Sequence, residues 1–253
     1  MKKIFLLLVF CATMIPARNF EPYRFMDGEE LTYKVNYSFF NLGTIVMQVN
    51  RVPGDYSPKR YHIHLVIESN PLLFWVDNHS VYDSYIDENL RVLKFVSNEN
   101  VEGEIYRAEY SFNYEDSVIT RRLYDNNNTL KKQDKQKIRP KMIDGISLIF
   151  FARANAHKQA RDTVFTFIEN KSGDVIFNFK NERHITKTEH VPDGLETVYF
   201  DGRLNISGIA GVSGPFSAYF SRDASRVPFV SFMKVFIGSV RLELIKWKGW
   251  QPE

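Results

Sequence analysis

Alternation of apolar and polar residues constrains this chain more than any other feature. In the segment 31–38, Leu31, Tyr33, Val35 and Tyr37 alternate with polar residues. A period of two is typical of a strand with one buried and one solvated face. The pattern recurs along the chain between clusters of Gly, Pro, Asn and Asp, which favour turns. It predicts an all-β chain of about a dozen strands.

The carboxyl end of the chain, 214–247, shows the pattern most clearly. Three strands are predicted there, over Phe216–Ser221, Val227–Phe236 and Ser239–Lys246. The residues 222–225 and the single Gly238 supply the turns between them. Further upstream, two separate strands are predicted over Val175–Phe179 and Arg183–Val191.

One helix is predicted, over Ile143–Ala156. Asp144 can accept hydrogen bonds from the first backbone N–H groups. Ile146, Ile149 and Phe150 form a narrow apolar stripe, typical of a helix that packs one side against other elements. We expect this helix to plug one face of a β structure.

A sheet of this size is not expected to stay flat and isolated, because unpaired edges and twist favour curling or closure. The expected fold is all-β with one helix: a single strongly curved antiparallel sheet that forms an open or closed barrel with the helix as plug. A two-sheet β-sandwich is the alternative. One β-rich domain is expected over residues 22–250, and its interior must be filled by side chains, the helix or a ligand.

Residues 1–17 have the pattern of a secretory signal peptide. Lys2 and Lys3 precede the apolar run Ile4–Ile15, and Pro16 and Ala17 follow it. The run is too short to span a bilayer as a stable helix. We expect a periplasmic or secreted mature protein with no transmembrane span. The alternatives are an uncleaved membrane anchor and lipid attachment at Cys11.

Cysteine content and charge exclude several classes of protein. Cys11 is the only cysteine, so cleavage leaves a chain with no disulfide, thiol nucleophile or zinc-thiolate site. The formal net charge of +3 falls towards neutral when Lys2 and Lys3 are removed, so no nucleic-acid partner is expected. The basic stretch 131–139 is expected to be a solvated strand edge, with contact to anionic lipid or glycan as the alternative.

No arrangement of residues predicts a catalytic site. His62 and His64 lie two residues apart, and with His79 they could form part of a metal site, but no carboxylate at ligand spacing is evident, so no metal or cofactor is expected. Carboxylates paired in sequence, such as Glu29 and Glu30, are expected to be solvated. No Gly-x-Ser-x-Gly motif is present.

Asp223, Arg226 and Gly238 are expected to be structural. The Asp223 side chain would accept hydrogen bonds from the turn backbone, and Arg226 would pair with it. The glycine-rich segment 208–214 is expected to be a loop, because a strand rather than a helix follows it. Its apolar residues suit the rim of a cavity mouth.

Aromatic and apolar residues are the candidate ligand-binding set, because they would line an apolar cavity. Core packing is the alternative for each of them. The set comprises Trp75, Tyr106, Tyr110, Phe112, Phe150, Ile209 and Val212.

Three segments resemble a family of exported bacterial proteins of unknown function. The opening segment 28–49 carries the Gly-Glu-x-Leu-x-Tyr pattern. The segment 144–153 is similar to the family's middle, although Gly145 stands where a proline is common. The carboxyl-terminal segment of the chain carries the pattern of Asp223, Arg226, Pro228 and Gly238. The resemblance implies a periplasmic, sheet-rich domain with no assigned activity. A distant fold-level analogy is the half-open barrel of lipoprotein carriers, which hold acyl chains in an apolar cavity.

These observations together predict a non-enzymatic envelope protein. It would bind an apolar or acyl ligand in a curved-sheet cavity or assist envelope assembly, so its expected partner is an apolar ligand or another envelope protein. The alternative is an envelope glycan- or lipid-processing enzyme whose site assembles only in three dimensions.

Overall fold

The computed structural model describes residues 23–72, 78–101, 104–168, 171–208, 211–235 and 238–252. The predicted signal segment 1–17 lies outside these residues. In chain order the elements are β1 (Glu29–Tyr37), β2 (Phe40–Arg51), β3 (Arg60–Ser69), β4 (Asn78–Asp87), β5 (Val92–Val101), β6 (Glu104–Asn113), β7 (Val118–Tyr124), β8 (Leu130–Lys137), β9 (Met142–Asp144), α1 (Ser147–Asn155), β10 (Ala160–Ile168), β11 (Lys171–Thr186), β12 (Leu195–Leu204), β13 (Gly214–Ser221), β14 (Pro228–Lys234) and β15 (Ser239–Lys248).

The fifteen strands formed by the described residues belong to one sheet, in the order β8-β7-β6-β5-β4-β3-β2-β1-β15-β14-β13-β12-β11-β10-β9. Two meanders, β1–β8 and β10–β15, are joined where the first and last strands pair antiparallel. The short β9 adds to β10 in parallel. Because β8 and β9 are the two edges of the sheet, hydrogen bonding does not close it. The predicted single curved sheet is confirmed, in its open form.

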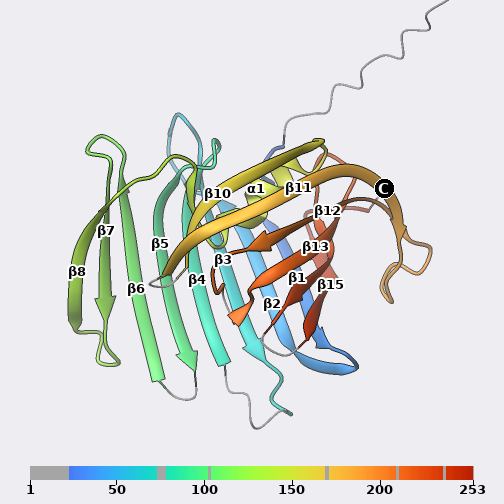
Figure 1. Ribbon diagram of the computed structural model, residues 1–253, viewed down its shortest axis with the longest axis horizontal. Helices are drawn as coiled ribbons and strands as arrows, with labels where there is room; N and C mark the ends of the chain where they lie inside the picture. Colours follow the sequence, from blue (N-terminus) through green and yellow to red (C-terminus); the bar gives the residue numbers. More distant parts are fainter. Residues whose placement is uncertain are drawn as a thin grey trace, which may run out of the picture.

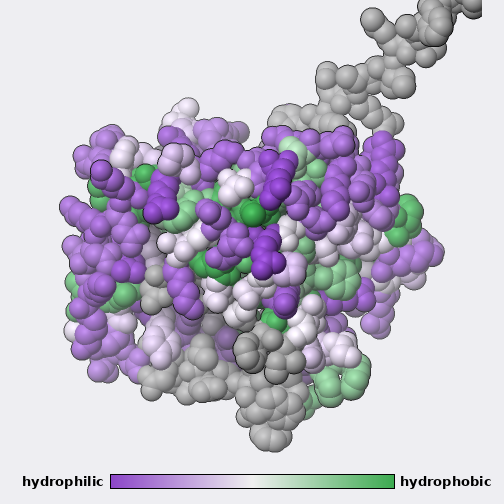
Figure 2. All heavy atoms as spheres, in the orientation of Figure 1, coloured by the Kyte–Doolittle hydropathy of each residue, from purple (hydrophilic) through white to green (hydrophobic). Residues whose placement is uncertain are grey.

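The sheet curls so that its two halves face each other. Figure 1 shows the yellow-to-red strands crossing in front of the blue-to-green ones. Phe167 of β10 packs on Tyr110 and Phe112 of β6, with ring centroids 4.6 and 5.4 Å apart. Hydrophilic residues dominate the face shown in Figure 2, and hydrophobic residues appear there as scattered small patches. The apolar faces therefore meet on the inside of the curl.

The inner and outer faces follow the alternation in the sequence. In β3, Tyr61, Ile63 and Leu65 are buried, whereas His62 and His64 on the other face are half-buried. Successive side chains of a strand point to opposite faces, so one face of each strand supplies the core. Among the described residues, no helix is long and apolar enough to cross a bilayer.

The helix begins at Ser147, later than the predicted Ile143. Ile143 instead belongs to β9 and pairs with Thr166 of β10. The Asp144 carboxylate accepts hydrogen bonds from the backbone N–H groups of Ile146 and Ser147, both at 2.8 Å. Asp144 therefore accepts hydrogen bonds from the first backbone N–H groups of the helix, as expected. It does so as the last residue of strand β9 rather than from within the helix.

The basic stretch predicted to be a solvated strand edge forms most of the edge strand β8, whose residues are almost all exposed. Lysines on an edge strand disfavour pairing with a second chain.

The two strands predicted over Val175–Phe179 and Arg183–Val191 form one continuous strand, β11, with a register shift between Phe179 and Glu182. A bulge inserts a residue without ending the strand.

Candidate functional site: an apolar cavity closed by the helix

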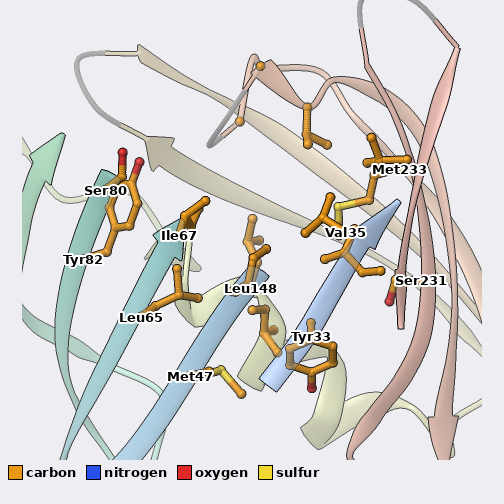
Figure 3. A pocket seen from close by; sticks show the side chains of 18 of the residues that line it. Tyr33, Val35, Met47, Leu65, Ile67, Ser80, Tyr82, Leu148, Ser231 and Met233 are labelled. Carbon is orange, nitrogen blue, oxygen red and sulfur yellow. The ribbon is translucent and has the colours of Figure 1, made fainter. Parts of the chain in front are cut away.

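A cavity of about 1190 Å³ lies between the facing halves of the sheet. This volume exceeds the range of roughly 300–1,000 Å³ that is typical of small-molecule sites. Figure 3 shows side chains from both walls of the cavity pointing towards one another. Its inner part is lined mainly by apolar residues: Tyr33, Val35, Met47, Leu65, Ile67, Tyr82, Val175, Phe177, Phe200, Ala218 and Phe220.

Helix α1 closes one end of the cavity. Leu148, Ile149 and Ala152 line it from the helix, and Figure 3 shows Leu148 projecting into the space. Phe151 packs on Phe177 of β11, with ring centroids 5.3 Å apart. The predicted role of the helix as a plug is therefore visible in the structure.

The opposite end of the cavity is polar. Its lining there includes Glu68 at the end of β3, Asn78 at the start of β4 and Lys171 at the start of β11. Arg107 of β6 also lines it, pairs with Glu109 and donates a 2.9 Å hydrogen bond to Asn128. Charged groups thus gather at the strand ends farthest from α1.

Exposed apolar side chains flank this polar end. Phe39 and Phe40, at the turn between β1 and β2, are 84 % and 49 % exposed, and Leu72 is 83 % exposed. The backbone N–H of Asn70 donates to the carbonyl oxygen of Leu42 at 2.8 Å, which holds the two connections side by side. The described part of the rim therefore presents large apolar residues to solvent.

A buried ion pair fastens α1 to the sheet. Arg153 donates from both terminal nitrogens to the Glu29 carboxylate, at 2.6 and 2.7 Å, and neither side chain is exposed. Arg153 also donates to the carbonyl oxygen of Ser225 at 2.8 and 3.0 Å. Burial opposes the charge on Arg153, but the Glu29 carboxylate keeps the pKa of Arg153 above its ordinary value. The expectation that Glu29 is solvated is wrong, because Arg153 reaches it from a distant segment.

The turn between β13 and β14 completes this closed end. The Asp223 carboxylate accepts hydrogen bonds from the backbone N–H of Ser225 at 2.7 Å and from Trp250 Nε1 at 2.9 Å. Asp223 therefore stabilises the turn as predicted. The backbone N–H of Arg226 also donates to the Asp223 carboxylate, at 3.2 Å, and Arg226 Nη1 donates to the carbonyl oxygen of Arg153 at 3.4 Å.

Asp144 anchors the start of the helix below the cavity. It is fully buried and accepts hydrogen bonds from the hydroxyls of Ser84 and Ser147, at 2.6 and 2.8 Å, besides those from the helix backbone. Burial raises the pKa of Asp144, although these donors oppose the shift. Ser84 belongs to β4, so the network ties α1 to the first half of the sheet.

The predicted ligand-binding residues divide into three groups. Tyr106 and Val212 line the cavity. Tyr110 and Phe112 lie outside its lining, because Phe167 covers them. Phe150 is also outside the lining and stacks on Phe25 with ring centroids 5.2 Å apart. Trp75 and Ile209 lie outside the described residues.

Gly238 has the structural role expected of it. It lies between β14 and β15 with φ +77°, a conformation that favours glycine. A Cβ at this position would lie 2.9 Å from the ring of Tyr37. The carbonyl oxygen of Gly238 accepts a hydrogen bond from the N–H of Val235 at 3.2 Å, which closes the turn.

The segments that carry the family resemblance meet at the closed end of the cavity. Glu29 comes from the segment 28–49 and Arg153 from the segment 144–153. Asp223 and Arg226 come from the carboxyl-terminal segment. Sequence reasoning missed this convergence because Glu29 and Arg153 are 124 residues apart. The available signal was Arg153, the single charged residue within α1.

One solved structure agrees with this fold. A beta-barrel-like protein of domain of unknown function DUF1849 from Brucella abortus has a TM-score of 0.58 at 11 % identity, over 91 % of this chain and 100 % of that one. A protein from Bacteroides fragilis described as exported, with a YmcC-like fold, has a TM-score of 0.35 at 10 % identity, over 90 % of this chain and 98 % of that one. No curated protein sequence matches the chain significantly. A family described as "Protein of unknown function (DUF3108)" matches residues 32–245, and the chain therefore belongs to the DUF3108 family.

Proposed function

We propose that this protein is a non-enzymatic envelope protein that binds the acyl chain of an amphiphilic molecule inside its curved sheet. The cavity of about 1190 Å³ with its mainly apolar lining is the observation that carries the proposal. Each methylene group transferred from water into such surroundings contributes about 0.8 kcal/mol. The cavity therefore suits a long hydrocarbon chain.

The polar end of the cavity fits the other part of such a molecule. Lys171 and Arg107 offer cationic groups at the end opposite α1, and Glu68, Glu99 and Asn78 offer acceptors. An amphiphile would place its chain against the apolar walls and its polar group among these side chains. The closed end is occupied by Leu148 and the buried Arg153–Glu29 pair, so entry is proposed from the polar end.

Location in the bacterial periplasm is part of the same proposal. The signal pattern of residues 1–17 supports it. The exposed Phe39, Phe40 and Leu72 beside the polar end would give the protein an apolar contact with an envelope surface or an envelope protein during loading.

A fluorescent acyl probe tests the proposal. Titration of the mature protein with cis-parinaric acid is expected to give saturable binding. Val35 of β1 and Ser80 of β4 both line the cavity (Figure 3), so Val35→Trp and Ser80→Trp should each weaken binding at least tenfold. The matched control is Lys34→Trp, because Lys34 neighbours Val35 on β1 and its side chain points to the other face.

Two outcomes would oppose the proposal. Binding that is unchanged in both cavity variants, or weakened equally in the control, would show that the probe binds elsewhere. Mass spectrometry of the probe and of envelope phospholipids, after each has been incubated with the protein, tests whether the protein is instead an enzyme. Cleavage or transfer of an acyl group by the wild type would favour a lipid-processing enzyme.

A further inference from the structure

Two histidines and a carboxylate converge on the outer face of the sheet, away from the cavity. His62 and His64 share the outer face of β3, and Asp83 lies opposite His64 in the antiparallel pairing with β4. His62 Nε2 lies 2.7 Å and His64 Nδ1 2.8 Å from the same oxygen, Asp83 Oδ1. The three ligand atoms all lie within 4.8 Å of one another.

The spacing of these atoms is close to that of ligands around one metal ion. Zinc binds imidazole nitrogen and carboxylate oxygen at about 2.0–2.2 Å, so neighbouring ligand atoms in its shell lie roughly 3.0–3.4 Å apart. The observed N···O separations are a few tenths of an ångström shorter. Binding of the ion would therefore require the side chains to rotate slightly outwards.

The surroundings hold the three groups in place. The Tyr85 ring stacks on the His62 ring, with centroids 4.5 Å apart and planes 11° apart, which limits rotation of that imidazole. The side chains of His62, His64 and Asp83 are 28 %, 33 % and 22 % exposed, so solvent could complete the coordination shell.

We infer that His62, His64 and Asp83 form a binding site for a divalent transition-metal ion, with Zn²⁺ as the reference ion. Two imidazoles and one carboxylate suit zinc and its first-row neighbours, whereas Mg²⁺ and Ca²⁺ prefer all-oxygen sites. The sequence pointed to His62 and His64, but it also pointed to His79. His79 instead pairs with Glu68, with 2.6 Å between Nδ1 and Oε1. The proposed site is independent of the cavity.

Isothermal titration of the metal-free protein with Zn²⁺ tests the site. The wild type is expected to bind one equivalent per chain. His62→Ala, His64→Ala and Asp83→Asn should each weaken binding at least tenfold, since each removes one of three protein ligands. His79→Ala is the matched control, because it removes a histidine paired with a carboxylate across the same two strands, and it should bind like the wild type.

A second measurement keeps the test valid if a variant folds poorly. In the wild-type protein, the imidazole ¹⁵N resonances of His62 and His64 should shift on addition of Zn²⁺, and those of His79 should not. The inference is overturned if Zn²⁺ does not bind, if it shifts neither His62 nor His64, or if His79→Ala lowers the affinity as much as the ligand variants.

Discussion

Arg153 of the helix and Glu29 of the first strand form a doubly hydrogen-bonded ion pair that is closed off from solvent. The pair links α1 to the strand at the centre of the sheet order. A buried charge that loses its partner is costly, whereas an exposed pair contributes little. The closed end of the cavity therefore depends on both members being present.

Removing one member of this pair should destabilise the fold strongly. Glu29→Gln and Arg153→Met are each expected to lower the free energy of unfolding by about 3–5 kcal/mol, because each leaves the other group buried without its counter-charge. Urea denaturation followed by circular dichroism measures the change. The double variant should cost less than the sum of the single variants.

Lys131→Ala is the control for this prediction. Lys131 pairs with Asp125 at 2.9 Å, but its side chain is 63 % exposed. Its loss should lower the free energy of unfolding by less than about 1 kcal/mol. Equal effects of Lys131→Ala and Arg153→Met would contradict the role assigned to the buried pair.

Stability should fall in acid partly because of His157. Burial lowers the pKa of His157 to about 4, and the positive charges of Arg226 and Arg222 contribute. Above pH 6.5 the imidazole is neutral in both the folded and the unfolded chain. As the pH falls from about 6.5 towards about 4, only the unfolded chain takes up the proton, so the free energy of unfolding decreases, by about 3 kcal/mol in all.

A non-titrating variant isolates this contribution from that of other acidic and basic groups. His157→Gln should lose less stability than the wild type between pH 7 and pH 4.5, and the difference should be about 2 kcal/mol. Parallel stability curves for the two proteins would show that His157 is not held neutral by the fold.

Acyl-chain length should control affinity if the cavity holds the hydrocarbon. Extending a saturated fatty acid by two methylenes should strengthen binding by about 1.6 kcal/mol, roughly tenfold, until the cavity is full. Displacement of cis-parinaric acid by fatty acids of increasing length gives the series. Affinities that do not depend on chain length would indicate that only the carboxylate is recognised, at the surface.

Processing of the amino terminus tests the proposed export. Protein recovered from a bacterial periplasmic fraction should begin at Arg18, which follows the predicted cleavage site. An intact Met1 would favour a membrane anchor. A mature chain that begins at a lipid-modified Cys11 would favour a lipoprotein.

Much of the fold could be predicted because alternation reports directly on burial. Tyr61, Ile63 and Leu65 are inside, as their spacing requires. Alternation carries less information where neither face is buried, as in the almost fully exposed β8. It also does not give strand order: the pairing of β1 with β15 joins the two ends of the chain, and no local pattern specifies it.

The candidate sites were harder to predict, because they depend on pairing across strands and across the chain. Asp83 meets His62 and His64 only through the register of β3 and β4. The cavity lining was predicted in part, at Tyr106 and Val212. Tyr110 has the same alternation as Tyr106, but Phe167 from the far half of the sheet covers it. Sequence spacing identifies the inner face of a strand, but not which part of that face stays open.

Native mass spectrometry of the protein after gentle extraction from cells is the most direct test of the account. The wild type and Lys34→Trp should carry a bound acyl-chain molecule that is released on denaturation, and Val35→Trp should carry much less of it. A wild-type protein that is always free of ligand, or a bound molecule retained equally by Val35→Trp, would contradict the claim that the inside of this curved sheet is a binding site.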